Sequence, residues 1–164
     1  DALSGRARRI FPPIIRCEAG DAYITLVAGP ATRWAEVRET LRSDGLIEAS
    51  QEAPEALAAM LEAPGVRVAP DGADYPAIVL TPTPRGIRAH GVLAESAADI
   101  LRHGLAWLGG DFRDGPSEAI ATAAMLTLES SAPIAVELDG EVAELRAYSQ
   151  VWGDTSSVAF LATA

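Results

Sequence analysis

The sequence contains no lysine and no asparagine, because all 13 of its Lys and Arg residues are arginine. Without a lysine amine, the chain cannot form a lysine Schiff base, anchor pyridoxal phosphate through a lysine or supply the lysine of a nucleotide-binding P-loop. Without asparagine, it has no N-glycosylation acceptor and no Cys-His-Asn triad. These absences exclude several mechanisms and indicate none in their place.

Cysteine and aromatic residues are scarce. Cys17 is the single cysteine, which excludes an internal disulfide and favours a reducing compartment, so we expect a cytoplasmic location. Aromatic residues make up 5% of the chain, so we expect a core of mainly small side chains. No apolar run approaches the roughly 18 residues of a membrane span. Because the chain starts at Asp1 rather than methionine, we expect that a segment upstream of Asp1 has been removed.

The charge is acidic, with a formal net value of −10 at pH 7. Nucleic acids and anionic membranes attract basic surfaces, so neither is an expected partner. The one basic cluster is at the N-terminus, at Arg6, Arg8 and Arg9. We therefore expect residues 1–12 to be a flexible basic segment and residues 13–164 to form a single domain.

The residue pattern predicts an α+β domain in which about four helices pack on antiparallel sheet, in the order ββ-αα-βββ-αα-βββ. The expected helices run from Thr32 to Asp44, from Pro54 to Ala63, from Ser96 to Leu108 and from Pro116 through Leu128. The expected strands are 14–19, 22–28, 66–69, 77–81, 87–93, 134–138, 143–151 and 158–162.

Two of these patterns make specific predictions. Asp139 and Gly140 separate two alternating segments, which is typical of a two-residue β-hairpin turn. Alternation also places Trp152 on the face opposite Val151, so we expect Trp152 to be at least partly exposed and available for self-association.

Few residues suggest chemistry, and each has a structural alternative. The candidate ligand-binding residues are Arg85, His90, His103, Asp111, Arg113 and Asp114. His103 follows Asp99 at i, i+4 spacing, which is also typical of a local helix ion pair. Asp114 precedes an expected helix and is equally suited to cap it. We interpret Cys17 as an inert strand residue, and the last hairpin as carrying a solvated acidic face made of Glu137, Glu141 and Glu144.

No catalytic motif is present. The chain lacks a G-x-G-x-x-G loop after a strand and a G-x-S-x-G nucleophile elbow, and no metal or cofactor is expected. We therefore expect a non-catalytic accessory, regulatory or assembly subunit that binds another protein or a second copy of itself. Enzyme activity is not favoured but stays open. The alternative is a small-molecule-binding domain or an enzyme whose site gathers the scattered Arg, His and Asp residues.

Overall fold

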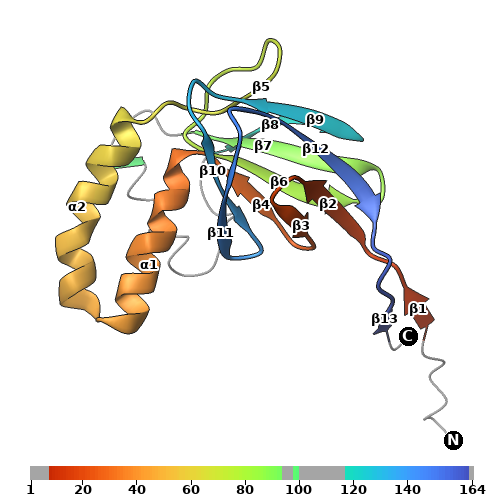
Figure 1. The fold of residues 1–164 in the computed structure, drawn as a ribbon, viewed down its shortest axis with the longest axis horizontal. Coiled ribbons are helices and arrows are strands. Elements are labelled where there is room, and N and C mark those ends of the chain that lie inside the picture. The colour runs from red at the N-terminus through yellow and green to blue at the C-terminus, as the bar shows by residue number, and fades with distance from the viewer. Residues whose placement is uncertain (1–7, 94–97, 100–116, 163–164) are drawn as a thin grey trace, which may run out of the picture.

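The computed structural model describes residues 8–93, 98–99 and 117–162, and this part of the chain is mostly β-sheet (Figure 1). One short 3-10 helix, η1 (Pro30–Arg33), leads into the helices α1 (Trp34–Ser43) and α2 (Leu46–Glu62). The strands are β1 (Arg8–Ile10), β2 (Pro13–Cys17), β3 (Gly20–Ala22), β4 (Leu26–Ala28), β5 (Arg67–Val68), β6 (Ile78–Thr83), β7 (Gly86–Val92), β8 (Ser117–Ala123), β9 (Met125–Glu129), β10 (Ile134–Leu138), β11 (Glu141–Leu145), β12 (Tyr148–Thr155) and β13 (Phe160–Ala162).

The strands form two antiparallel sheets that pack face to face. One has six strands in the order β11-β10-β4-β6-β7-β8, and the other has five in the order β3-β2-β12-β9-β5. The core between them consists of inward-facing residues of both sheets, among them Ile15, Leu80, Ile87, Leu128 and Val151, each almost fully buried. This arrangement is a β-sandwich, in which alternate residues of each strand face the core.

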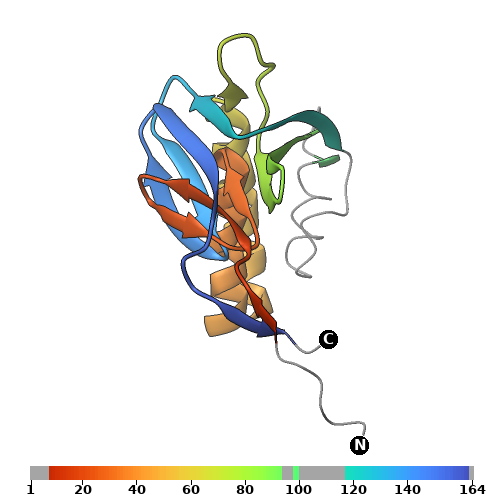
Figure 2. The ribbon, with the colours of Figure 1, turned by 90° about the vertical axis from the view of Figure 1, so that its right-hand side faces the viewer.

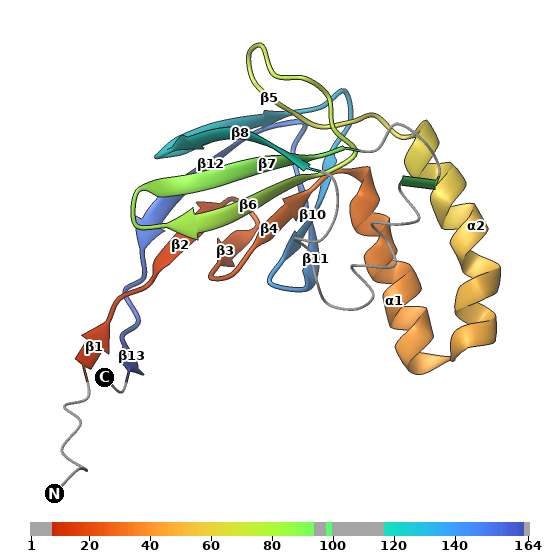
Figure 3. The same ribbon diagram turned by 180° about the vertical axis from the view of Figure 1, so that it is seen from behind.

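The two helices cover part of the outer face of the six-stranded sheet. Trp34 and Val37 of α1 and Met60 of α2 pack with Val79 and Val92 of the sheet in a second buried cluster. Figure 3 shows α1 and α2 at one end of the molecule, whereas the β6–β7 turn lies at the other end. The turn end of this hairpin therefore lies away from the two helices.

The first and last described strands form a separate two-stranded ribbon. In it, β1 pairs with β13, with Ile10 opposite Phe160. Figure 2 shows the ribbon extending away from the body of the sandwich. Both of these side chains are exposed. The expected division into residues 1–12 and 13–164 stays a prediction.

The expected order with about four helices is wrong, because residues 119–128 belong to strands β8 and β9 instead of a helix. Alanine dominates this segment and favours a helix locally. Pairing with β7 and β12 overrides that preference, and the alternate residues Leu126 and Leu128 enter the core. Of the expected helix from Ser96 to Leu108, only Ala98 and Asp99 are described, and they are helical.

Other boundaries also differ from the expectation. Helix α2 begins at Leu46, so Pro54 lies inside it instead of at its start. Pro54 removes the helical hydrogen bond to the carbonyl of Ser50, and Ser50 is exposed to water, which can replace that bond. The expected strand 143–151 is divided between β11 and β12, which belong to different sheets.

The local turn predictions are confirmed. Strands β10 and β11 form the expected hairpin around Asp139 and Gly140, both of which have positive φ angles, 49° and 93°. The expected helix containing Trp34 is also present and ends before Asp44. Neither described helix is long and apolar enough to cross a membrane.

Candidate functional site around the β6–β7 hairpin

The β6–β7 hairpin carries the two predicted site residues that the structure describes. Arg85 lies in the turn between the strands and His90 lies within β7. Along β7, Ile87 and Ala89 face the core and are fully buried, so Arg88 and His90 lie on the outer face of the sheet. Arg88 is exposed and His90 is half-buried.

The turn is held by the hydroxyl group of Thr83. It donates a hydrogen bond to the carbonyl of Gly86 at 2.7 Å and accepts one from the backbone N–H of Arg85 at 3.2 Å. Gly86 has a φ angle of +119°, and a Cβ there would lie 2.5 Å from the carbonyl oxygen of Ala123. The position therefore requires glycine, and the hydrogen bonds of Thr83 hold the backbone of the turn around Arg85.

A groove of about 370 Å³ lies beside this turn. Its lining residues are Pro13, Thr83, Pro84, Arg85, Gly86, Ala124, Gly153, Asp154 and Thr155. The two sheets approach closely here, because a Cβ on Gly153 would lie 3.2 Å from the Cα of Gly86. The backbone N–H of Gly153 also donates to the carbonyl of Ala124 at 2.8 Å. Residues far apart in the sequence therefore form one concave surface.

The charges of this groove are unevenly paired. Asp154 accepts a hydrogen bond from the backbone N–H of Thr155 at 2.7 Å and forms an ion pair with Arg16 at 3.2 Å. Arg85 has no ion pair within the described part of the chain. The groove therefore holds one neutralised carboxylate and one guanidinium that is available to an anion.

The six predicted site residues do not all enter one described pocket. His90 lies four residues beyond Gly86 along the extended strand β7, which puts it about 13 Å from the turn that carries Arg85. They share a hairpin but not a groove, since His90 does not line the groove at the turn. The other four residues, His103, Asp111, Arg113 and Asp114, lie outside the described residues. Their convergence stays a prediction.

Sequence reasoning missed Arg88, Asp154 and Thr155. The alternation of β7 carried a signal for Arg88, because apolar or small residues at 87, 89 and 91 put residue 88 on the outer face. No local pattern brings Asp154 to the β6–β7 turn. That contact depends on the packing of β12 against the other sheet.

A second groove, of about 550 Å³, lies between α1 and the β10–β11 turn. Beside it, Arg38 of α1 donates to the Glu137 carboxylate at 2.5 Å, and the two side chains are 15% and 5% exposed. The interpretation of Glu137 as part of a solvated acidic face is therefore wrong, whereas Glu141 and Glu144 are exposed as expected. α1 lies on the strand face that carries Glu137, and this cover buries it.

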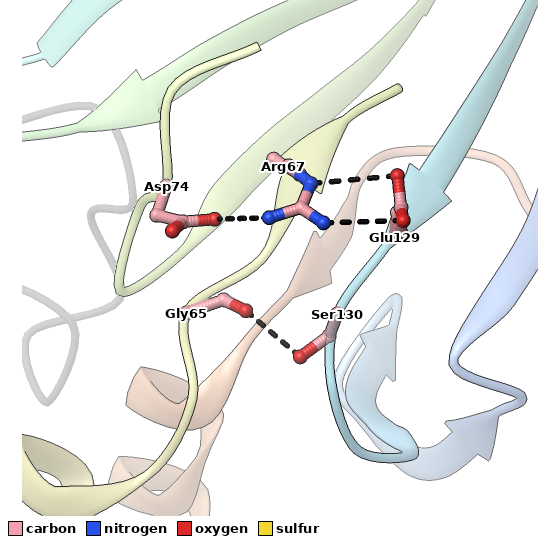
Figure 4. A network of polar contacts seen from close by, with 5 residues as sticks. All are labelled: Gly65, Arg67, Asp74, Glu129 and Ser130. Atoms are coloured by element: carbon pink, nitrogen blue, oxygen red, sulfur yellow. Dashed lines mark hydrogen bonds and ion pairs between the residues drawn. The ribbon is translucent and has the colours of Figure 1, made fainter. Parts of the chain in front are cut away.

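A polar network links β5 to β9 (Figure 4). Arg67 donates to both carboxylate oxygens of Glu129, at 3.4 and 3.1 Å, and lies 3.5 Å from Asp74. These hydrogen bonds raise the pKa of Arg67. Nearby, the hydroxyl group of Ser130 donates to the carbonyl of Gly65 at 2.8 Å. Each of these side chains has a partner, so the network joins the two strands.

The predicted exposure of Trp152 is confirmed, with 40% of the residue exposed. It lies between Arg16 and Met125 on the outer face of the five-stranded sheet. Self-association through this face stays a prediction. The expected strand position of Cys17 is confirmed, and burial raises the pKa of its thiol. Its lack of reactivity stays a prediction.

The likeness to known proteins lies in the fold. No family model matches the chain, and no curated protein matches its sequence. Three solved structures from Bacillus anthracis str. Sterne are similar, one described as a diacylglycerol kinase and two assigned to that activity. They are 8%, 13% and 10% identical, with TM-scores of 0.50, 0.51 and 0.50, and the matches cover 93%, 90% and 90% of this chain.

The matches cover 53%, 55% and 53% of those chains. This chain shares the fold of about half of a diacylglycerol kinase. The expectation of a non-catalytic subunit that acts through protein–protein binding is therefore wrong, because the solved structures that share this fold are described as, or assigned to, diacylglycerol kinases. The alternative, a ligand-binding domain or an enzyme, agrees better with this likeness.

Proposed function

We propose that this chain forms part of an enzyme that transfers a phosphoryl group to the hydroxyl group of a lipid, as the name diacylglycerol kinase implies for its structural neighbours. The observation that carries the proposal is a fold match over 90% or more of the chain. The chain spans about half the length of those proteins. The reaction of the whole enzyme is therefore part of the proposal.

The residues of this chain restrict how such an enzyme recognises phosphate. Phosphoryl transfer depends mainly on positioning and on stabilising negative charge on the phosphate oxygens. Because this sequence has no lysine, any such stabilisation that this part of the enzyme supplies comes from arginine side chains, hydroxyl groups and backbone N–H groups. Arg85 and Arg88 on the β6–β7 hairpin have the chemistry to do so, together with the hydroxyl group of Thr155.

Kinases also use divalent cations bound by carboxylates and phosphate oxygens. The described residues do not fit a protein-built cation site, because no three His, Cys, Asp or Glu side chains gather among them. We therefore assign no step of the reaction to a metal held by this part of the chain. A cytoplasmic location and self-association also remain parts of the proposal.

The test is a transfer assay on the longest natural polypeptide that contains this sequence. It is incubated with ATP labelled on the γ-phosphate and with diacylglycerol in mixed detergent micelles, and the lipid is extracted. We expect labelled phosphatidic acid. The double variant Arg85→Gln/Arg88→Gln should lower the rate at least about tenfold, because each lost charged hydrogen bond is worth about 1.5 to 3 kcal/mol.

Arg33→Gln is the control for the chemistry of each substitution, because it removes one positive charge from an exposed residue of η1, away from the hairpin. It should keep the wild-type rate. Failure to label diacylglycerol or other lipid alcohols would overturn the proposed function.

A further inference from the structure

A row of three polar residues crosses the outer face of β6, β7 and β8. Arg88 lies directly opposite Thr81 on β6 and directly opposite Thr122 on β8. Residues that face each other across antiparallel strands project to the same side, with Cβ atoms about 4.5 to 5.5 Å apart. Arg88 and Thr122 are exposed and Thr81 is half-buried. One arginine therefore lies between two threonines on the outer face of the sheet.

The described residues that adjoin this row on the two neighbouring strands include no acidic side chain. On the same face, the described register neighbours are Val79, Thr83, Gly86, His90 and Ala119. Neither these five positions nor the row itself carries aspartate or glutamate, although the chain has 23 acidic residues. A nearby carboxylate would neutralise the guanidinium and repel an anion. Within the described part of this face, no carboxylate compensates the charge of Arg88.

Arg88 also differs from the arginines that stabilise the fold. Four described arginines form ion pairs with carboxylates, namely Arg16, Arg38, Arg67 and Arg146. The side chain of Arg88 has no such partner among the described residues. A guanidinium presents five N–H donors in a fixed plane that matches two oxygens of a phosphate group. Arg88 and the two adjacent threonines therefore bring together donor groups of the kind that bind a tetrahedral anion.

We propose that Arg88, Thr81 and Thr122 form a binding site for a phosphate group. The guanidinium contacts two phosphate oxygens, and the hydroxyl groups donate to the remaining ones. This site deepens the proposed function, on which it rests for the identity of the ligand. The phosphate belongs either to a nucleotide or to a phosphorylated lipid, and the two sources present the same chemistry to the row.

The test measures binding, so that it does not depend on turnover. The full natural polypeptide is titrated at low ionic strength with a non-hydrolysable ATP analogue in a calorimeter. In a second arm, it is sedimented with vesicles of phosphatidylcholine with or without phosphatidic acid. The variants are Arg88→Gln, the double variant Thr81→Val/Thr122→Val and, as the control, Arg33→Gln.

We expect Arg88→Gln to weaken binding of one of the two probes about ten- to a hundredfold, the usual loss for a charged hydrogen-bonded contact. The double threonine variant should weaken it about tenfold, because two neutral hydrogen bonds are lost while the charge remains. Arg33→Gln should bind as the wild type does. The probe that responds identifies the source of the phosphate.

Equal binding by Arg88→Gln and Arg33→Gln would overturn the site, as would a wild-type protein that binds neither probe. The site and the proposed function can fail separately. If Arg88→Gln loses phosphate binding but the wild type labels no lipid, the site stands and the kinase function is wrong. If the wild type labels lipid and Arg88→Gln binds both probes normally, the function stands and the site is wrong.

Discussion

The outer face of the six-stranded sheet has two regions of opposite character. In the region under α1 and α2, Val79 and Val92 are buried in an apolar cluster with Trp34. Two residues further along β6, on the same face, the half-buried Thr81 lies opposite the exposed Arg88. The half-buried His90, which lies opposite Val79, marks the boundary. One hairpin thus supplies both a core and a polar surface.

This difference shows what alternation does and does not determine. Period-two alternation assigns residues 79, 81, 88, 90 and 92 to one face. What packs on that face sets the chemistry each position tolerates, because burying a valine side chain contributes about 1.5 to 3 kcal/mol while burying an unpaired charge is costly. The helices α1 and α2 cover the part of the sheet where the outward-facing strand residues are apolar and leave uncovered the part where they are polar.

The largest expected effect compares one substitution in the two regions. Val92→Asp places a carboxylate at a position 5% exposed, beneath the helices. It should lower the free energy of unfolding by about 4 kcal/mol or more, because the buried charge has no partner. Thr81→Asp lies on the same face outside that cluster, opposite Arg88. It should change the free energy of unfolding by about 0.5 kcal/mol or less.

Urea unfolding, followed by circular dichroism, measures both values. Similar losses for the two variants would show that α1 and α2 do not divide this face as described.

The second comparison concerns a charge under the helices and a charge on the open surface. Arg38→Met leaves the buried Glu137 without its ion-pair partner and should cost about 3–5 kcal/mol. Arg88 has no described carboxylate partner, so Arg88→Met leaves no buried charge unpaired. It should lower the free energy of unfolding by about 0.5 kcal/mol or less.

The double variant Arg38→Met/Glu137→Leu tests the reason for that loss. It should recover most of the stability, because it removes both charges instead of leaving one buried. A double-mutant cycle from chemical denaturation measures the coupling. Purely additive losses would contradict the pairing of Arg38 with Glu137.

The smallest expected effect concerns the solvent-exposed ion pair between Glu18 and Arg146. Hydrogen bonds from Arg146 lower the pKa of Glu18 from 4.5 to about 2. A lowered folded-state pKa means that the carboxylate stabilises the fold above pH 4.5 and that this contribution disappears as the pH falls toward 2. Water screens this exposed pair, so the effect should be small.

Thermal unfolding of Glu18→Gln and of the wild type between pH 7 and pH 2 gives the test. The melting temperature of the variant should be slightly lower at neutral pH and should converge with that of the wild type at the acidic limit. Glu141→Gln, at an exposed β11 position, is the control. A gap between Glu18→Gln and the wild type that grows toward low pH would reverse the predicted sign.

Part of the candidate site could be predicted from the sequence. The turn chemistry around Arg85 and the two strands beside it were expected, because proline, glycine and alternation act over a few residues. The groove could not be predicted. It depends on Gly153 and Asp154, which come from the other sheet, and no local pattern encodes how two sheets pack.

By itself, the sequence determined the features that depend on neighbouring residues. These are the hairpin at Asp139 and Gly140, the helix that begins near Trp34, and the exclusion of every lysine-dependent mechanism. Such features follow from φ preferences and side-chain periodicity, which act over a few neighbouring residues, and from which residue types the chain contains.

The tertiary structure alone decided the rest. Residues 119–128 are strands because β7 and β12 pair with them, and Glu137 is buried because Arg38, 99 residues away, covers it. Alanine is compatible with both helix and strand, and a glutamate is buried only when a partner compensates its charge. Contacts between residues far apart in the sequence decide both the strands at 119–128 and the burial of Glu137, so only the tertiary structure reveals them.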